Sequence, residues 1–150
     1  MHVKLVKLTI ILITIQLVAS CASSGSSDFF TQVAEKDYSN MYLRGVFNWW
    51  EVNTAFKLLA NSDKSYAVTI ELIADGQPYD FKVADADWTM TLNCGNDFGA
   101  VPMRLSEQVK LVCASDSLNL KFTPSETAMY RFILDVSNNS QPELVIEKMD

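Results

Sequence analysis

The stretch YAVTIELIADGQPYDFKV at residues 66–83 gives the clearest indication of the fold. Its first part alternates apolar with small or polar side chains, with the apolar ones at Tyr66, Val68, Ile70 and Leu72. Residues 79–83 alternate in the same way after a DGQP turn at 75–78. Alternation with period two puts every second side chain on one face, so both segments are predicted to be half-buried β-strands joined by a turn.

Outward from these two segments the same signals recur. A third alternating segment spans 130–136, and the further strand candidates are 42–46, 56–59, 88–92, 109–112, 118–122 and 144–147. Residues 28–40 are expected to form a short helix or a linker. No long amphipathic helix interrupts the strands, so the pattern predicts an all-β fold over 41–150, an immunoglobulin-like β-sandwich of about 7–9 short strands.

The N-terminus has the pattern of an export signal. Lys4 and Lys7 precede an apolar run over 8–18 that is too short to span a bilayer, which needs ~20 apolar residues. Val18-Ala19-Ser20-Cys21 resembles the bacterial lipobox, which implies acylation (palmitate) of Cys21 and cleavage before it. The competing interpretation is an ordinary secretory peptide.

The sequence therefore divides into three expected parts: a lipoprotein signal peptide at 1–20, the lipidated cysteine with a tether and linker at 21–40, and the domain at 41–150. The small polar run ASSGSS at 22–27 has the composition of a flexible tether. Ala22 follows the lipidated cysteine, which by resemblance to enterobacterial sorting favours the outer membrane over the inner. We expect a lipid-anchored protein of the cell envelope.

Composition narrows the function. Loss of Lys4 and Lys7 lowers the basic count from 12 to 10 against 18 acidic residues, a net charge of −8. Nucleic acid is therefore not an expected partner, because phosphates require clustered Lys and Arg. The single histidine is His2, which leaves with the signal peptide. Without histidine, the Ser-His-Asp and Cys-His centres and histidine–metal sites are excluded, and we expect no cofactor and no metal.

Two cysteines remain once Cys21 is assigned to the lipid. Cys94 and Cys113 form an even pair in an exported, oxidising compartment, where a disulfide is expected. The bridge would close a loop of about twenty residues and stabilise the domain by roughly 3 kcal/mol. Two buried thiols are the alternative.

Two segments, MYLRGVFNWW at 41–50 and YDFKVADADW at 79–88, contain all three tryptophans of the chain. Together with a Tyr-Arg-Phe strand from Tyr130, they resemble the starch- and glycogen-binding immunoglobulin-like accessory domains of pullulanase-type α-glucan enzymes. The resemblance covers roughly residues 41–147. It implies a non-catalytic module that binds α-glucan or another polysaccharide.

Carried over by position, the resemblance implies carbohydrate-binding roles for Trp50, Trp88, Lys82 and Asn48. Trp49 occupies the variable position of the motif and is a further candidate. Indoles would cover the apolar face of a sugar ring, while amide and ammonium groups would meet its hydroxyls. Asn48 either meets the ligand or serves the turn, and each tryptophan is alternatively a core residue. Trp49 and Trp50 cannot both point inward from an extended strand, because successive side chains alternate.

Other functions stay open at this point. An exposed aromatic pair equally suits an envelope module that docks a protein partner or an amylase. An enzyme would have to rely on carboxylates alone, as some glycosidases do, but we expect no catalytic residue. A calcium site at Asp85-x-Asp87 lacks the glycine and distal glutamate of an EF-hand loop.

Overall fold

The computed structural model describes residues 35–99 and 101–150, so the predicted signal peptide, Cys21, the tether at 22–27 and residues 28–34 lie outside the described residues. The described strands are β1 (Tyr42–Gly45), β2 (Leu59–Ser62), β3 (Ser65–Leu72), β4 (Tyr79–Ala84), β5 (Cys94–Gly95), β6 (Val109–Lys110), β7 (Val112–Cys113), β8 (Leu120–Phe122), β9 (Ala128–Asp135) and β10 (Glu143–Lys148). Three short 3₁₀ turns are η1 (Val46–Asn48), η2 (Thr54–Phe56) and η3 (Met90–Leu92).

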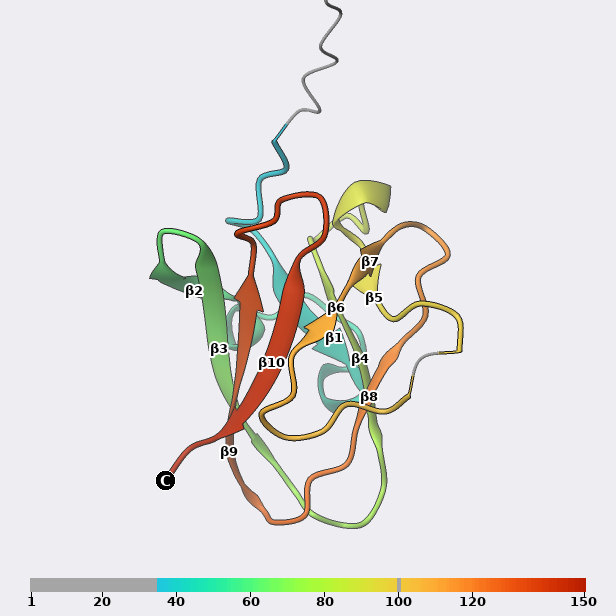
Figure 1. The fold of residues 1–150 in the computed structure, drawn as a ribbon. Coiled ribbons are helices and arrows are strands. Elements are labelled where there is room, and N and C mark those ends of the chain that lie inside the picture. The colour runs from blue at the N-terminus through green and yellow to red at the C-terminus, as the bar shows by residue number, and fades with distance from the viewer. Residues whose placement is uncertain (1–34, 100) are drawn as a thin grey trace, which may run out of the picture. The chain divides into compact units, whose positions relative to one another are not determined.

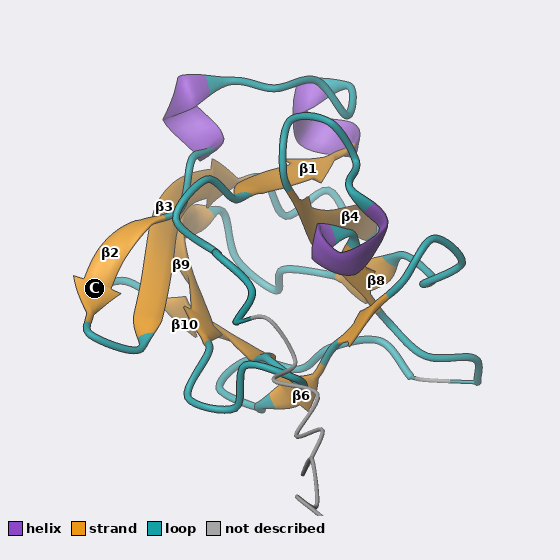
Figure 2. Cartoon of the chain, turned by 90° about the horizontal axis from the view of Figure 1, so that it is seen from above, coloured by secondary structure: helices purple, strands orange, loops and turns teal. Residues whose placement is uncertain are grey.

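The strands form two antiparallel sheets (Figure 1). In the first sheet the order is β1-β4-β5-β7, and β8 also pairs with β4. In the second sheet the order is β2-β3-β9-β10-β6. Seen from above, β1, β4 and β8 lie on one side of the domain, and β3, β9 and β10 lie on the other (Figure 2). The all-β sandwich predicted from the period-two pattern is confirmed.

The core lies between the two sheets. Phe81 of β4 and Phe132 of β9 are fully buried, and their rings meet edge to face with centroids 5.4 Å apart. Such aromatic pairs add about 0.5–1.5 kcal/mol beyond the area they bury. The remaining large, fully buried side chains come from the strands of both sheets, from the segments that link them and from the N-terminal approach: Tyr38, Met41, Leu43, Leu58, Leu72, Leu111, Leu120, Tyr130, Leu134 and Leu144.

Two predicted strands are wrong because local turns replace extended backbone: one begins later than predicted and the other does not form. Over 56–59, Asn53 Oδ1 accepts from Ala55 N at 2.9 Å and starts η2, so β2 begins only at Leu59. Over 88–92, Trp88 adopts the left-handed region and η3 follows, so no strand forms. An Asx-type cap and a positive φ both stop a strand from continuing, and the alternation of apolar residues does not reveal them.

The predicted strand at 109–112 is divided between the sheets. Its first half, β6, pairs with β10, whereas β7 pairs with β5 of the other sheet. Leu111 lies buried at the crossing, and its N–H donates to Pro142 O at 2.8 Å. The segment therefore changes sheets at one core residue.

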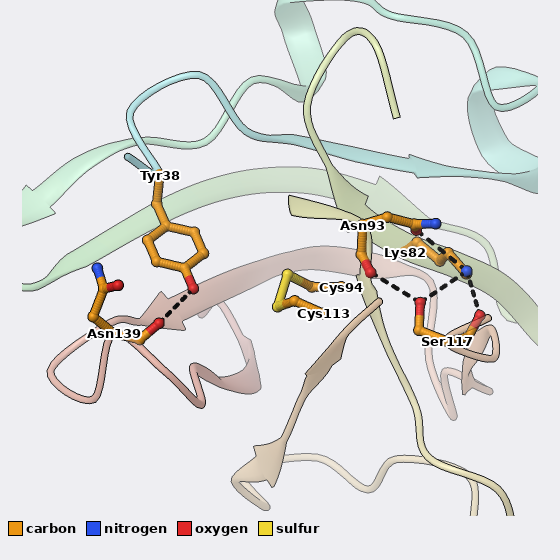
Figure 3. Close-up of a disulfide and its surroundings, with 7 residues drawn as sticks. All are labelled: Tyr38, Lys82, Asn93, Cys94, Cys113, Ser117 and Asn139. Carbon is orange, nitrogen blue, oxygen red and sulfur yellow. Dashed lines mark hydrogen bonds between the residues drawn. A yellow bond between two sulfur atoms is a disulfide. The ribbon is translucent and has the colours of Figure 1, made fainter. Parts of the chain in front are cut away.

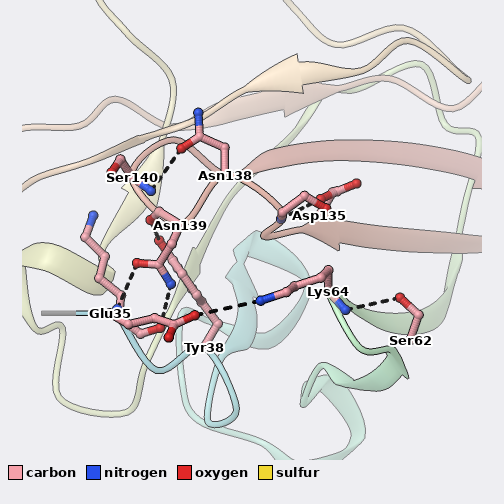
Figure 4. Close-up of polar contacts among 10 residues, drawn as sticks. Glu35, Tyr38, Ser62, Lys64, Asp135, Asn138, Asn139 and Ser140 are labelled. Atoms are coloured by element: carbon pink, nitrogen blue, oxygen red, sulfur yellow. Dashed lines mark hydrogen bonds and ion pairs between the residues drawn. The ribbon is translucent and has the colours of Figure 1, made fainter. Parts of the chain in front are cut away.

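Packing of the domain begins before the expected boundary at residue 41. Asn139 Oδ1 accepts from Lys36 N at 2.8 Å and its Nδ2 donates to Lys36 O at 2.9 Å, as a neighbouring strand would (Figure 4). The Tyr38 hydroxyl donates to Asn139 O at 2.8 Å, and its ring is buried. In the described part of 28–40, residues 35–40, the chain forms no helix. This part is docked on the β9–β10 loop.

Candidate functional site

The turn after β1 is fixed by two residues. A Cβ on Gly45 would meet Asp80 O at 2.6 Å and Phe81 Cβ at 2.7 Å, so only glycine fits there. Asn48 is buried; its Oδ1 accepts from Gly45 N and its Nδ2 donates to Leu43 O, both at 2.9 Å. These contacts support the interpretation that Asn48 serves the turn. Its amide groups are engaged by backbone and do not line the depression described below.

The tryptophans have an unusual backbone conformation. Trp49, Trp50 and Trp88 have φ values of 56°, 64° and 57°, in the left-handed region that non-glycine residues seldom adopt. Such residues persist only where the surrounding structure holds them, and they gather at functional sites. As a result Trp49 projects outward, 85% exposed, whereas Trp88 is 37% exposed and Trp50 is partly buried.

Arg44 holds both tryptophan-bearing loops. Its Nε donates to Trp50 O at 2.8 Å, and its Nη1 donates to Asp85 O at 2.9 Å and to Ala86 O at 3.2 Å. Its Cζ lies 3.8 Å from the centroid of the Trp88 ring, within cation–π range. Burial lowers the pKa of the Arg44 guanidinium, although the Glu51 and Asp85 carboxylates oppose that shift. Arg44 keeps its charge at neutral pH, so both loops stay tied to β1.

Lys82 is the register partner of Arg44 on the same face of the sheet. Its ammonium donates to Asn93 Oδ1 at 3.2 Å, to Ser117 Oγ at 3.0 Å and to Ser117 O (Figure 3). These three acceptors use all three donors of the ammonium. Burial lowers the pKa of Lys82, while the Asp116 carboxylate raises it. Lys82 thus ties β4 to the segments before Cys94 and after Cys113, and its role is that of a brace.

The disulfide strengthens the same region. Cys94 and Cys113 are bonded, and they are register partners in β5 and β7 (Figure 3). Each of these strands has only two residues. The predicted pairing of the two cysteines is present, and it supports a pair of strands too short to be stable by their hydrogen bonds alone.

The side chains of Trp50 and Trp88 lie close together over the part of the sheet that Lys82 and the disulfide hold in place. Their ring centroids are 6.4 Å apart and their planes are inclined by 38°. With Lys82, Asn93 and Asn119 they line an open depression of about 480 Å³. Within the described residues, Asn93 Nδ2 and the Asn119 amide make no hydrogen bond to protein atoms; Asn119 is exposed, whereas Asn93 is 8% exposed. The depression joins an apolar surface to a rim of amides.

The structure thus brings three of the five expected binding residues together, namely Trp50, Trp88 and Lys82. Trp49 and Asn48 do not line the depression. Sequence reasoning missed Asn93 and Asn119. For Asn119 a signal existed, because it lies between Leu118 and buried Leu120 in a predicted strand and so belongs to that strand's polar face. Nothing in the local sequence marked Asn93.

The acidic turn at Asp85-x-Asp87 has a structural use. Asp85 Oδ1 accepts from Thr89 N at 2.8 Å and so closes the loop that carries Trp88. Among residues 35–99 and 101–150, no group of three His, Cys, Asp or Glu side chains is placed to hold a metal ion. Over the same ranges the chain has no helix with the length and apolar character needed to cross a membrane.

Comparison with solved structures supports the β-sandwich fold. No protein-family model matches the chain, and a search of curated proteins gives no match. Among solved structures, the chain is similar to the ligand-induced structure of AmyP-SBD, a starch-binding domain, with a TM-score of 0.58. The match covers 99% of this chain and 97% of that one at 14% identity. The chain thus has a β-sandwich fold of the kind seen in a starch-binding domain, as the sequence resemblance predicted.

Proposed function

We propose that this chain is a non-catalytic, membrane-anchored lipoprotein whose β-sandwich binds α-glucan at the Trp50–Trp88 depression. The observation that carries the proposal is the pair of inclined indoles beside free amide groups. Successive rings of an α-1,4-linked glucan are inclined to one another, so two inclined indoles match a curved chain. Apolar surface with a few well-placed polar groups is the usual composition of such sites.

The lining of the depression favours binding over hydrolysis. Canonical glycosidases place two carboxyl groups on either side of the scissile bond. None of the five lining residues is an Asp or a Glu. The likeness in fold to a starch-binding domain supports the same proposal.

Alanine at Trp50 or at Trp88 is expected to weaken binding of glycogen or amylopectin about 30-fold, since loss of a central aromatic contact typically costs about 2 kcal/mol. The measurement is affinity electrophoresis of the full chain in a detergent without a sugar headgroup, through gels with and without each polymer. Trp49→Ala is the matched control, because Trp49 is exposed outside the depression.

Two results would contradict this assignment. Equal mobility of the native chain in all gels would overturn glucan binding and favour a protein partner in the envelope. Equal loss in Trp49→Ala and Trp50→Ala would place the ligand elsewhere on the surface.

The membrane anchor is proposed from Cys21, which lies outside the described residues. The support is the lipobox-like Val18-Ala19-Ser20-Cys21 after an apolar run and before a small polar tether. Two or three acyl chains give stable anchoring, since each buried CH₂ contributes ~0.8 kcal/mol. Outer-membrane placement rests on Ala22 alone.

Cells fed a labelled palmitate are expected to label the native chain and to leave a Cys21→Ala variant unlabelled. The variant should also move from the membrane fraction to the soluble exported fraction, because its lipid is missing. Cys113→Ala is the control that keeps Cys21. Labelling of the Cys21→Ala variant would disprove the anchor at this position.

A further inference from the structure

The Trp50–Trp88 depression continues across the sheet. Asn119 lines it and also lines a second depression of about 320 Å³, bounded by Asp80, Leu118 and Lys121. Leu118 in turn belongs to a third depression of about 230 Å³, which Phe98 borders. Asn119 is common to the first and second depressions, and Asn96, Asp97 and Leu118 are common to the second and third. We call this row of adjoining depressions, from the indoles over β8 to Phe98, the furrow.

The far part of the furrow repeats the chemistry of the near part. Phe98 is 92% exposed, which is unusual for a large aromatic side chain, and Leu118 beside it is 45% exposed. Polar groups flank them, with Asn96 and Asp97 lining both the second and the third depressions. Lys121 Nζ pairs with Asp80 Oδ1 at 2.8 Å along the edge. Apolar surface again lies beside hydrogen-bonding groups.

Residues 94–96, which directly precede the Asp97-Phe98 pair, are held in place. Asn96 N donates to Leu118 O at 2.8 Å, and Leu118 N donates to Asn96 O at 2.9 Å. A Cβ on Gly95 would lie 2.1 Å from Leu118 O, so glycine is required for this approach. Cys94 bonds to Cys113 directly before it. A braced segment presents an aromatic ring at a smaller entropic loss than a free loop would.

We infer that the furrow is an extended binding groove in which one α-glucan chain runs from the indoles past Asn119 and stacks a later glucose unit on Phe98. This inference rests on the proposed function and specifies its ligand as a long chain. Short oligosaccharides would occupy only the indole end. Longer ones would gain contacts at Leu118 and Phe98.

The test compares maltotriose with maltoheptaose by calorimetry on the full chain in a detergent without a sugar headgroup. Phe98→Ala should weaken maltoheptaose binding about tenfold and leave maltotriose binding unchanged, while Phe98→Tyr should restore the affinity for the longer chain. Met90→Ala is the control, because Met90 is 61% exposed and lines none of the three depressions.

Each of the other outcomes would overturn either the extended groove or the proposed function. Equal maltoheptaose affinity in native and Phe98→Ala chains would overturn the extended groove and leave the indole site standing. Loss of maltotriose binding in Phe98→Ala would overturn it as well, because the ring would then act at the short-ligand site. Failure of the native chain to bind either sugar would overturn the proposed function itself.

Discussion

Replacing Arg44 with glutamine is expected to weaken α-glucan binding about 100-fold, which corresponds to about 2.7 kcal/mol and exceeds the effect of either tryptophan substitution. Arg44 donates to Trp50 O in one loop and to Asp85 O and Ala86 O in the other, and it lies against the Trp88 ring. Glutamine is shorter, uncharged and cannot span both loops. Because the tryptophans have left-handed backbone conformations, the loops should relax once this support is gone.

The same substitution should reduce the free energy of unfolding by about 2 kcal/mol. Hydrogen bonds to charged groups contribute about 1.5–3 kcal/mol each, but loss of the desolvation penalty of a buried charge offsets part of that sum. Unfolding in urea and tryptophan fluorescence would measure both effects. We expect red-shifted emission with an unchanged far-ultraviolet circular dichroism spectrum, since the sheets stay folded.

Arg131→Gln is the matched control. Arg131 lies on β9 in the opposite sheet and donates to Asn61 Oδ1, far from the tryptophan loops in the strand order. It should leave sugar affinity unchanged. Wild-type affinity in Arg44→Gln would show that the tryptophan loops hold their shape without this arginine.

Removing the disulfide, by changing Cys94 and Cys113 together to serine, is expected to reduce the free energy of unfolding by about 3 kcal/mol. The two cysteines are 19 residues apart, and closing a loop of that length restricts the unfolded chain by roughly this amount. The two-residue strands β5 and β7 offer little to replace it. For a domain of this size the midpoint of thermal unfolding should fall by roughly 10–15 °C.

The double variant should also reveal the role of the bridge in the groove. Maltotriose affinity should change little, because the Lys82 contacts to Asn93 and Ser117 still brace the indole end. Maltoheptaose affinity should fall toward that of maltotriose, since the segment carrying Phe98 follows Cys94 directly.

Thermal unfolding with and without a reducing agent provides the control for the disulfide prediction. Reduction should lower the midpoint of the native chain to that of the double variant and leave the variant unchanged. A native chain whose midpoint is unaffected by full reduction would show that the bridge contributes nothing to stability.

The sequence was sufficient to predict the strands in which apolar and polar residues alternate regularly. Residues 66–72, 79–83 and 130–135 lie in strands at the predicted positions, and only Val136 of the predicted segments falls beyond the end of its strand. Each such strand turns one apolar face toward the core, and a shift of a single residue would move all those apolar side chains to the other face. The prediction failed at 56–59 and 88–92, where an Asn cap and a left-handed tryptophan end the extended backbone.

Only part of the candidate site could be predicted from the sequence. Trp50 and Trp88 were predicted because paired indoles at strand ends resemble a known kind of module, and the structure brings their rings together. Lys82 was expected to meet sugar hydroxyls, yet its ammonium is engaged by Asn93 and Ser117. A lysine that binds sugar and a lysine that holds neighbouring segments of the protein both lie on the polar face of a strand. The sequence pattern is the same for the two roles.

By itself the sequence determined the all-β class, the face that each regular strand buries and the two loops that carry the tryptophans. Only the tertiary structure decided that Arg44 supports both loops, that Asn93 and Asn119 complete the rim, and that the furrow reaches Phe98. The physical reason is the range of the interactions. The alternation of apolar and polar residues depends on residues that are close together in the chain. The pairing of β4 with β1, β5 and β8 depends instead on how the whole core packs.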